Sequence, residues 1–199
     1  MEADHSPEAL RENQLEMKEF EQMDREAVEY IAREFQGSVS AEKLEKMRGL
    51  PSQFKTHDDL ANAYAKETGK PAPDGLEGFS KSLEMPAQLC SDHAETINET
   101  IIHERLHQAS DADATSRLGE HLSEGVTQAL TEKMQKGVSF GNFYPEETKT
   151  AKGLMNEAGD AAVEKFYFQN NAQELKTALA GDAQHDSRLE QFKRANQKG

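Results

Sequence analysis

Cysteine is almost absent from this 199-residue chain, and basic residues are too few to balance the acidic ones. The single cysteine, Cys90, excludes an internal disulfide framework and fits a reducing compartment. With 37 acidic residues against 23 basic ones, the formal net charge is −14. Coulomb repulsion opposes the binding of such a chain to phosphate backbones, so we expect no nucleic-acid partner.

Long apolar runs are missing as well. No stretch resembles a membrane span, and the first residues are too acidic and polar for a cleavable signal peptide. Apolar residues make up 35% of the chain and charged residues 30%, which predicts a modest core built from helices with wide polar faces. These features leave open whether the protein leaves its cell by a route that needs no cleavable signal.

The spacing of apolar residues predicts a mainly α chain. Residues 7–36 form one long expected helix, with apolar side chains recurring at intervals of three and four. Ser40 is a good N-cap for a short helix that ends before Pro51. A third helix is expected to begin at Thr56 or His57 and to close at Gly69.

A loop rich in proline and glycine over residues 69–78 is the clearest break in the chain. It predicts a division into an N-terminal helical extension, residues 1–70, and a second domain, residues 71–199. The segment 79–89 is expected to hold at most a short β element, which Pro86 restricts to the edge of a sheet.

The sequence His103-Glu104-Arg105-Leu106-His107 is an HExxH motif within an apolar-periodic segment. Positions four apart share a face of a helix, so both imidazoles can reach one metal ion. Glu104 lies beside them, where a carboxylate could take a proton from a metal-bound water. A motif this short also arises by chance, and the alternative is an exposed polar helix without chemistry. The surrounding residues must decide.

Those surroundings favour a metal site. Asp92 predicts the start of the motif's helix, residues 110–113 predict its end, and a second helix is expected to begin near Thr115 or Ser116. Glu124 lies in that second helix and is the expected third ligand, because zinc hydrolases usually use three protein ligands and leave the fourth position for water. Gln128 follows one turn later on the same face, where its amide could orient a ligand.

Two other residues are alternative third ligands. Cys90 precedes the motif, although a buried small thiol is the commoner state of such a cysteine. Glu120 follows the motif so closely that the chain would have to reverse tightly. His121 either faces the cleft or is an exposed helix residue. The remaining histidines have no spacing partners and are interpreted as surface residues: His5, His57, His93 and His185.

The runs Thr100–Ser110, Glu124–Gln128 and Tyr144–Glu147, together with the aromatic segment Gly159–Phe168, resemble gluzincin-type (HExxH…E) zinc metallopeptidase domains, in particular the compact bacterial ones of secreted effectors and toxin modules. The resemblance covers about residues 85–180 and is most specific at the two metal helices. The chain departs from the commonest pattern by carrying Gln128 where an acid is frequent. A glutamine can accept a hydrogen bond from a ligand histidine but adds no negative charge.

The resemblance implies a mainly α, zincin-like fold that binds Zn2+ through His103, His107 and Glu124, with Glu104 as general base. Tyr144 is the candidate donor to the oxyanion, although tyrosines before helices more often pack with a tethered hydroxyl. The implied substrate is a protein or peptide. Further candidate partners are an immunity protein, a chaperone or a parent secretion protein. The resemblance also implies a protein that is secreted, or delivered by a dedicated secretion system, without a cleavable signal peptide. The alternative location is the cytoplasm.

Two other functions fit the sequence. One is an acidic helical binding or adaptor protein whose metal site is non-catalytic or lost. Structural zinc sites normally fill all four positions with cysteine or histidine, so a visible set of three ligands favours catalysis. The other is a zinc amidase that acts on a cell-wall amide, because it would use the same ligands.

Overall fold

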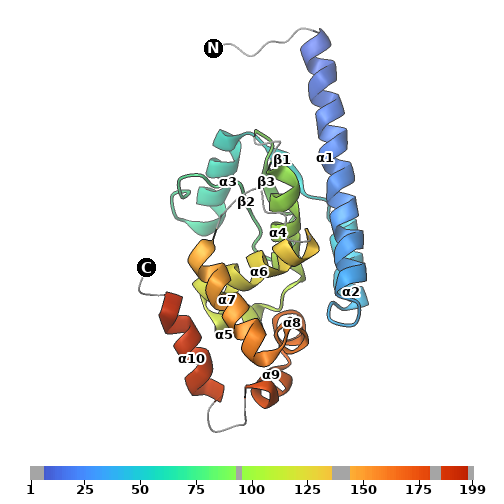
Figure 1. Ribbon diagram of the computed structural model, residues 1–199. Helices are drawn as coiled ribbons and strands as arrows, with labels where there is room; N and C mark the ends of the chain where they lie inside the picture. Colours follow the sequence, from blue (N-terminus) through green and yellow to red (C-terminus); the bar gives the residue numbers. More distant parts are fainter. Residues whose placement is uncertain (1–6, 93–95, 136–143, 180–184, 197–199) are drawn as a thin grey trace.

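The computed structural model describes residues 7–92, 96–135, 144–179 and 185–196, and over these ranges the chain is mainly helical, as predicted (Figure 1). No helix in the described ranges has an apolar stretch long enough to cross a membrane. The helices are α1 (Pro7–Glu34), α2 (Ala41–Gly49), α3 (His57–Thr68), α4 (Ile97–Ala109), α5 (Ala112–Leu118), α6 (Glu120–Met134), α7 (Pro145–Ala158), α8 (Asp160–Gln169), α9 (Ala172–Ala178) and α10 (His185–Asn196), and the strands are β1 (Gln53–Lys55), β2 (Gly78–Phe79) and β3 (Gln88–Cys90).

The helices α2 and α3 begin where capping residues predict. The Ser40 hydroxyl accepts a hydrogen bond from the Lys43 amide at 3.2 Å and caps α2. Thr56 caps α3 in the same way, and Gly69 ends that helix in the left-handed conformation that glycine adopts without a steric penalty. Local sequence therefore determines the ends of these helices.

The sheet is larger than the single edge element that the sequence predicts. It has three strands in the order β1-β3-β2, with β1 parallel and β2 antiparallel to β3. β3 follows Pro86 but occupies the centre, and residues 87–90 are buried. Strands of two or three residues are too short to show a hydrophobic alternation, so pairing with distant segments decides their conformation.

β2 lies directly against α4 because residue 78 has no side chain. A Cβ at Gly78 would lie 2.9 Å from the Cγ of Glu104 and 2.9 Å from the Cγ2 of Thr100. Glycine at this position therefore lets the strand approach the helix that carries the HExxH motif.

The N-terminal helices share one hydrophobic core with the rest of the chain, and α1 runs along α4 (Figure 1). Arg105, inside the HExxH motif, makes a buried ion pair with Asp24 of α1, with Nε 2.7 Å from Oδ1. Ser52 donates to the same carboxylate from its amide and its hydroxyl. The expected boundary at residue 70 therefore falls between segments that pack together, because β1 before it pairs with β3 after it.

Two predicted helix starts are wrong. Asp92 does not cap α4, which begins at Ile97; its carboxylate accepts instead from the His57 amide at 2.8 Å. The second helix does not begin near Thr115 or Ser116 and continue to Glu124. Asp111 caps the short α5, and Gly119, with φ of 78°, ends it. α6 starts afresh at the next residue. The first error arises because a distant backbone amide binds the Asp92 carboxylate, and the second because Gly119 breaks the helix at a point that the apolar pattern does not show.

Candidate metal centre

The histidines of the motif and Glu124 come together between α4 and α6. His103 Nε2 lies 3.1 Å from His107 Nε2, and Glu124 Oε2 lies 3.2 Å and 3.1 Å from these two nitrogen atoms. Among the described residues, these three side chains form a group that could hold a metal ion. His103 is buried, His107 and Glu124 are partly buried, and the three belong to helices that pack directly against each other.

The donor set and its spacing fit a small divalent cation. Tetrahedral zinc with nitrogen and oxygen ligands at about 2.0–2.2 Å separates neighbouring ligand atoms by about 3.3–3.6 Å. The three observed separations are only slightly shorter than this range. Burial alone would raise the pKa of the Glu124 carboxyl, but His107 and His103 together hold that pKa well below its usual range. The carboxylate is thus in its metal-binding form.

His103 Nδ1, the ring nitrogen that faces away from the cluster, contacts the side-chain amide of Gln128, which in turn hydrogen-bonds to the Glu99 carboxylate. His103 Nδ1 lies 3.1 Å from Gln128 Oε1, and Gln128 Nε2 donates to Glu99 Oε1 at 2.7 Å. Gln128 thus lies where the sequence predicts a supporting residue. Sequence reasoning did not identify Glu99. A signal for it existed, namely its position one turn before His103 on the same helix.

His107 has a weaker support of its own. Thr127 Oγ1 lies 3.5 Å from His107 Nδ1 and 2.6 Å from the hydroxyl of Tyr167, while the Thr127 hydroxyl donates to the carbonyl of Ser123 at 2.8 Å. Burial raises the pKa of Tyr167, so its hydroxyl stays protonated and can donate to Thr127. Sequence reasoning did not single out Tyr167, which comes from α8.

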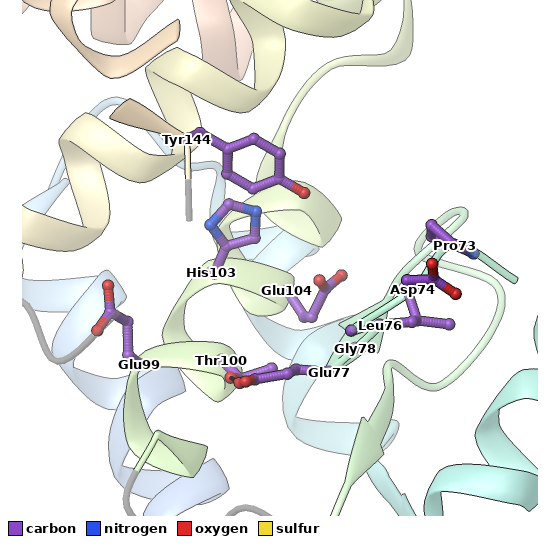
Figure 2. Close-up of a pocket in the computed structure, with 11 residues that line it drawn as sticks. Pro73, Asp74, Leu76, Glu77, Gly78, Glu99, Thr100, His103, Glu104 and Tyr144 are labelled. Atoms are coloured by element: carbon purple, nitrogen blue, oxygen red, sulfur yellow. Dashed lines mark hydrogen bonds between the residues drawn. The ribbon is translucent and has the colours of Figure 1, made fainter. Parts of the chain in front are cut away.

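Glu104 lies beside this group of three candidate ligands, with its carboxylate facing a cavity (Figure 2). Burial raises the pKa of this carboxyl to about 7, while His103 opposes the shift and Glu124 adds to it. The Ser80 hydroxyl donates to the backbone carbonyl of Glu104 at 3.1 Å and ties the loop after β2 to the helix. A carboxyl that gains and loses a proton near neutral pH is suited to general acid–base work.

The ring of Tyr144 lies against one face of the His103 imidazole. Its ring stacks on the imidazole with centroids 5.7 Å apart and an interplanar angle of 16°. Its hydroxyl lies on the side of His103 where the Glu104 carboxylate also lies (Figure 2). Burial raises the pKa of Tyr144, as do the negative charges of Glu124 and Glu104, so the phenol remains a hydrogen-bond donor.

Close packing of α6 and α7 brings Tyr144 to this position. A Cβ at Gly125 would lie 2.2 Å from the backbone oxygen of Glu147, which is closer than atoms can approach. Glycine directly after Glu124 therefore allows the first turn of α7 to lie against α6, and Tyr144 immediately precedes that turn.

Two adjoining cavities open onto these residues. One has a volume of about 330 Å³ and reaches Asp74, Glu77 and Glu99. The other, of about 440 Å³, extends towards Tyr64 and Phe79. They have five lining residues in common: Pro73, Leu76, Gly78, Glu104 and Tyr144. The loop before β2 thus forms one wall of a hollow that passes across the candidate centre.

The other candidate ligands lie apart from the cluster in the described structure. Cys90 is buried in β3, where burial raises the pKa of its thiol. Glu120 and His121 line the larger cavity, and His121 Nδ1 lies 3.5 Å from the Glu147 carboxylate. His57 is exposed, His5 and His93 lie outside the described residues, and the described residues include only the backbone of His185.

No protein-family profile, curated protein or solved structure matches this chain.

Proposed function

We propose that the protein is a zinc-dependent metallopeptidase of the gluzincin type. The observation that carries the proposal is the convergence of His103, His107 and Glu124 within one small group, with the Glu104 carboxylate beside it at the wall of a cavity. Three protein ligands with an open side are the usual arrangement in catalytic zinc sites, whereas structural sites fill all four positions.

Each residue of the site has a role in this mechanism. His103, His107 and Glu124 would hold the ion, which supplies a Lewis acid that lowers the pKa of water and polarises a carbonyl oxygen. Glu104 takes a proton from the attacking water and returns it to the leaving amine. A buried carboxyl with a pKa of about 7 can serve in both steps. The protonated Tyr144 hydroxyl donates a hydrogen bond to the oxyanion.

A peptide is the substrate that the surroundings favour. Within the described residues, β2 is an edge strand that pairs with β3, and its residues Gly78 and Phe79 line the larger cavity beside Glu104. An extended peptide can pair with the free edge of such a strand through its backbone. Action as a secreted effector or toxin rests on the sequence resemblance alone and is part of the same proposal.

The proposal is tested by metal content together with hydrolysis. Purified protein should bind about one zinc per chain, as a three-ligand site requires. Glu104→Gln should keep the zinc and lose nearly all cleavage of a peptide library, because an amide cannot accept the water's proton. Glu132→Gln is a matched control, since Glu132 lies on α6 and pairs with Lys152 away from the cluster. Absence of zinc after reconstitution, or near-normal cleavage by Glu104→Gln, would overturn the proposal.

A further inference from the structure

Behind His103, a glutamine stands between the imidazole and a buried carboxylate. The three side chains come from two helices: Glu99 and His103 from α4, and Gln128 from α6. Glu99 and Gln128 are each 1% exposed, so water hardly competes for their hydrogen bonds. The contacts are 2.7 Å between Glu99 and Gln128, and 3.1 Å between Gln128 and His103.

The chemistry of these groups fixes the direction of both hydrogen bonds. A carboxylate only accepts, so the amide nitrogen of Gln128 must face Glu99 and its oxygen must face His103. An amide oxygen only accepts, so the Nδ1 atom of His103 must carry a proton. In the neutral ring the lone pair is then on Nε2, which is the atom in the cluster with His107 and Glu124.

We propose that Glu99 is a positioning residue that acts through Gln128 to fix the tautomer and orientation of His103. The pair takes the place of a single carboxylate in direct contact with the imidazole. The negative charge lies one amide further away, and that amide transmits it by polarisation along the hydrogen bonds. This inference rests on the proposed metal centre, although the hydrogen bonds exist without a bound ion.

The arrangement predicts an asymmetric response to exchange of the two residues. Glu99→Gln keeps a donor and an acceptor in contact but removes the charge. Gln128→Glu places a second carboxylate against Glu99 and leaves both without a donor between them, which is unfavourable in a buried site. The double variant Glu99→Gln/Gln128→Glu restores complementarity, because the glutamate at 128 accepts from His103 and also from the amide at 99.

The experiment measures zinc affinity by competition titration, with the full chain and the metal alone as probe. Glu99→Gln should weaken zinc binding about 10-fold, at the lower end of the range for loss of a supporting hydrogen bond to a ligand histidine. Gln128→Glu should weaken binding at least as much, and the double variant should recover the affinity of the original chain or exceed it. The matched control is Glu164→Gln, because Glu164 is also a buried glutamate but pairs with Lys133 on another part of the core.

A second readout separates this inference from the proposed function. In metal-free protein, nitrogen-15 NMR should show a proton on His103 Nδ1, with slow exchange that Glu99→Gln accelerates and Glu164→Gln does not. That result can be obtained whether or not the protein cleaves peptides. The inference is overturned if Nδ1 carries no proton, if Glu99→Gln leaves both zinc affinity and exchange unchanged, or if the double variant binds zinc no better than Gln128→Glu.

Discussion

Replacement of Asp24 by alanine should destabilise this protein far more than the loss of an exposed ion pair. Asp24 and Arg105 are 2% and 1% exposed, and the guanidinium contacts both oxygens of the carboxylate. Removing the carboxylate leaves a buried cation without its counterion, which typically costs about 3–5 kcal/mol. Ser52 also loses the acceptor for its amide and its hydroxyl, so we expect the upper half of that range.

Thermal unfolding measures this cost. For a chain of this size, each kcal/mol lowers the melting temperature by about 2–4 °C, so Asp24→Ala should lower it by about 8–20 °C. Glu29→Ala is the control: it removes an ion pair between α1 and Arg48 of α2 that is about half exposed, and such pairs are worth at most about 1 kcal/mol. If Asp24→Ala and Glu29→Ala lowered the melting temperature equally, the buried pair would not hold α1 against the motif helix as we argue.

Three further changes test the site. Gly125→Ala should destabilise the fold by about 1–3 kcal/mol or more in denaturant unfolding and should reduce activity, because its Cβ would collide with the Glu147 backbone. Gly153→Ala is the control, since its Cβ would meet only Phe192 at 3.5 Å. Tyr144→Phe should keep zinc affinity but lower kcat about 100- to 1000-fold, as expected for loss of an oxyanion donor, and an unchanged kcat would remove Tyr144 from the mechanism. Glu124→Ala should weaken zinc binding by more than the roughly 10–100-fold cost of losing a supporting hydrogen bond. In Cys90→Ser and Glu120→Ala the zinc affinity should stay within a few-fold of the original. A strong loss of zinc affinity in Cys90→Ser would indicate a Cys-His-His site and a deformylase-like amidase.

Local signals in the sequence were sufficient for most helices. Ser40 and Thr56 cap helices through their own hydroxyls, and these contacts involve residues three positions away. β1 gave no such signal, because its three residues become a strand only by pairing with β3, more than thirty residues later. Asp92 misled for the same reason: the group that uses its carboxylate, the His57 amide, lies far away in the sequence.

The candidate site divides in the same way. The spacing within the motif places two imidazoles on one face of α4, and the sequence around Glu124 and Gln128 places both on one face of α6. The structure brings these faces together. The spacing of Glu99 from His103 was a signal in the sequence, but the contacts of Glu99 with Gln128 and of Tyr167 with Thr127 are created only by the packing of the helices.

The burial of the motif argues against an exposed polar helix without chemistry. His103 is 8% and Glu104 is 6% exposed, and the two residues between Glu104 and His107 are buried as well. Gathering two imidazoles and two glutamates out of water costs free energy unless their charges and lone pairs are compensated. The Nδ1 atoms of both histidines face protein groups, so their Nε2 atoms and the Glu124 carboxylate converge on one point. A cation at that point would compensate all three groups. Buried polar groups that do not stabilise the fold by themselves are expected at functional sites.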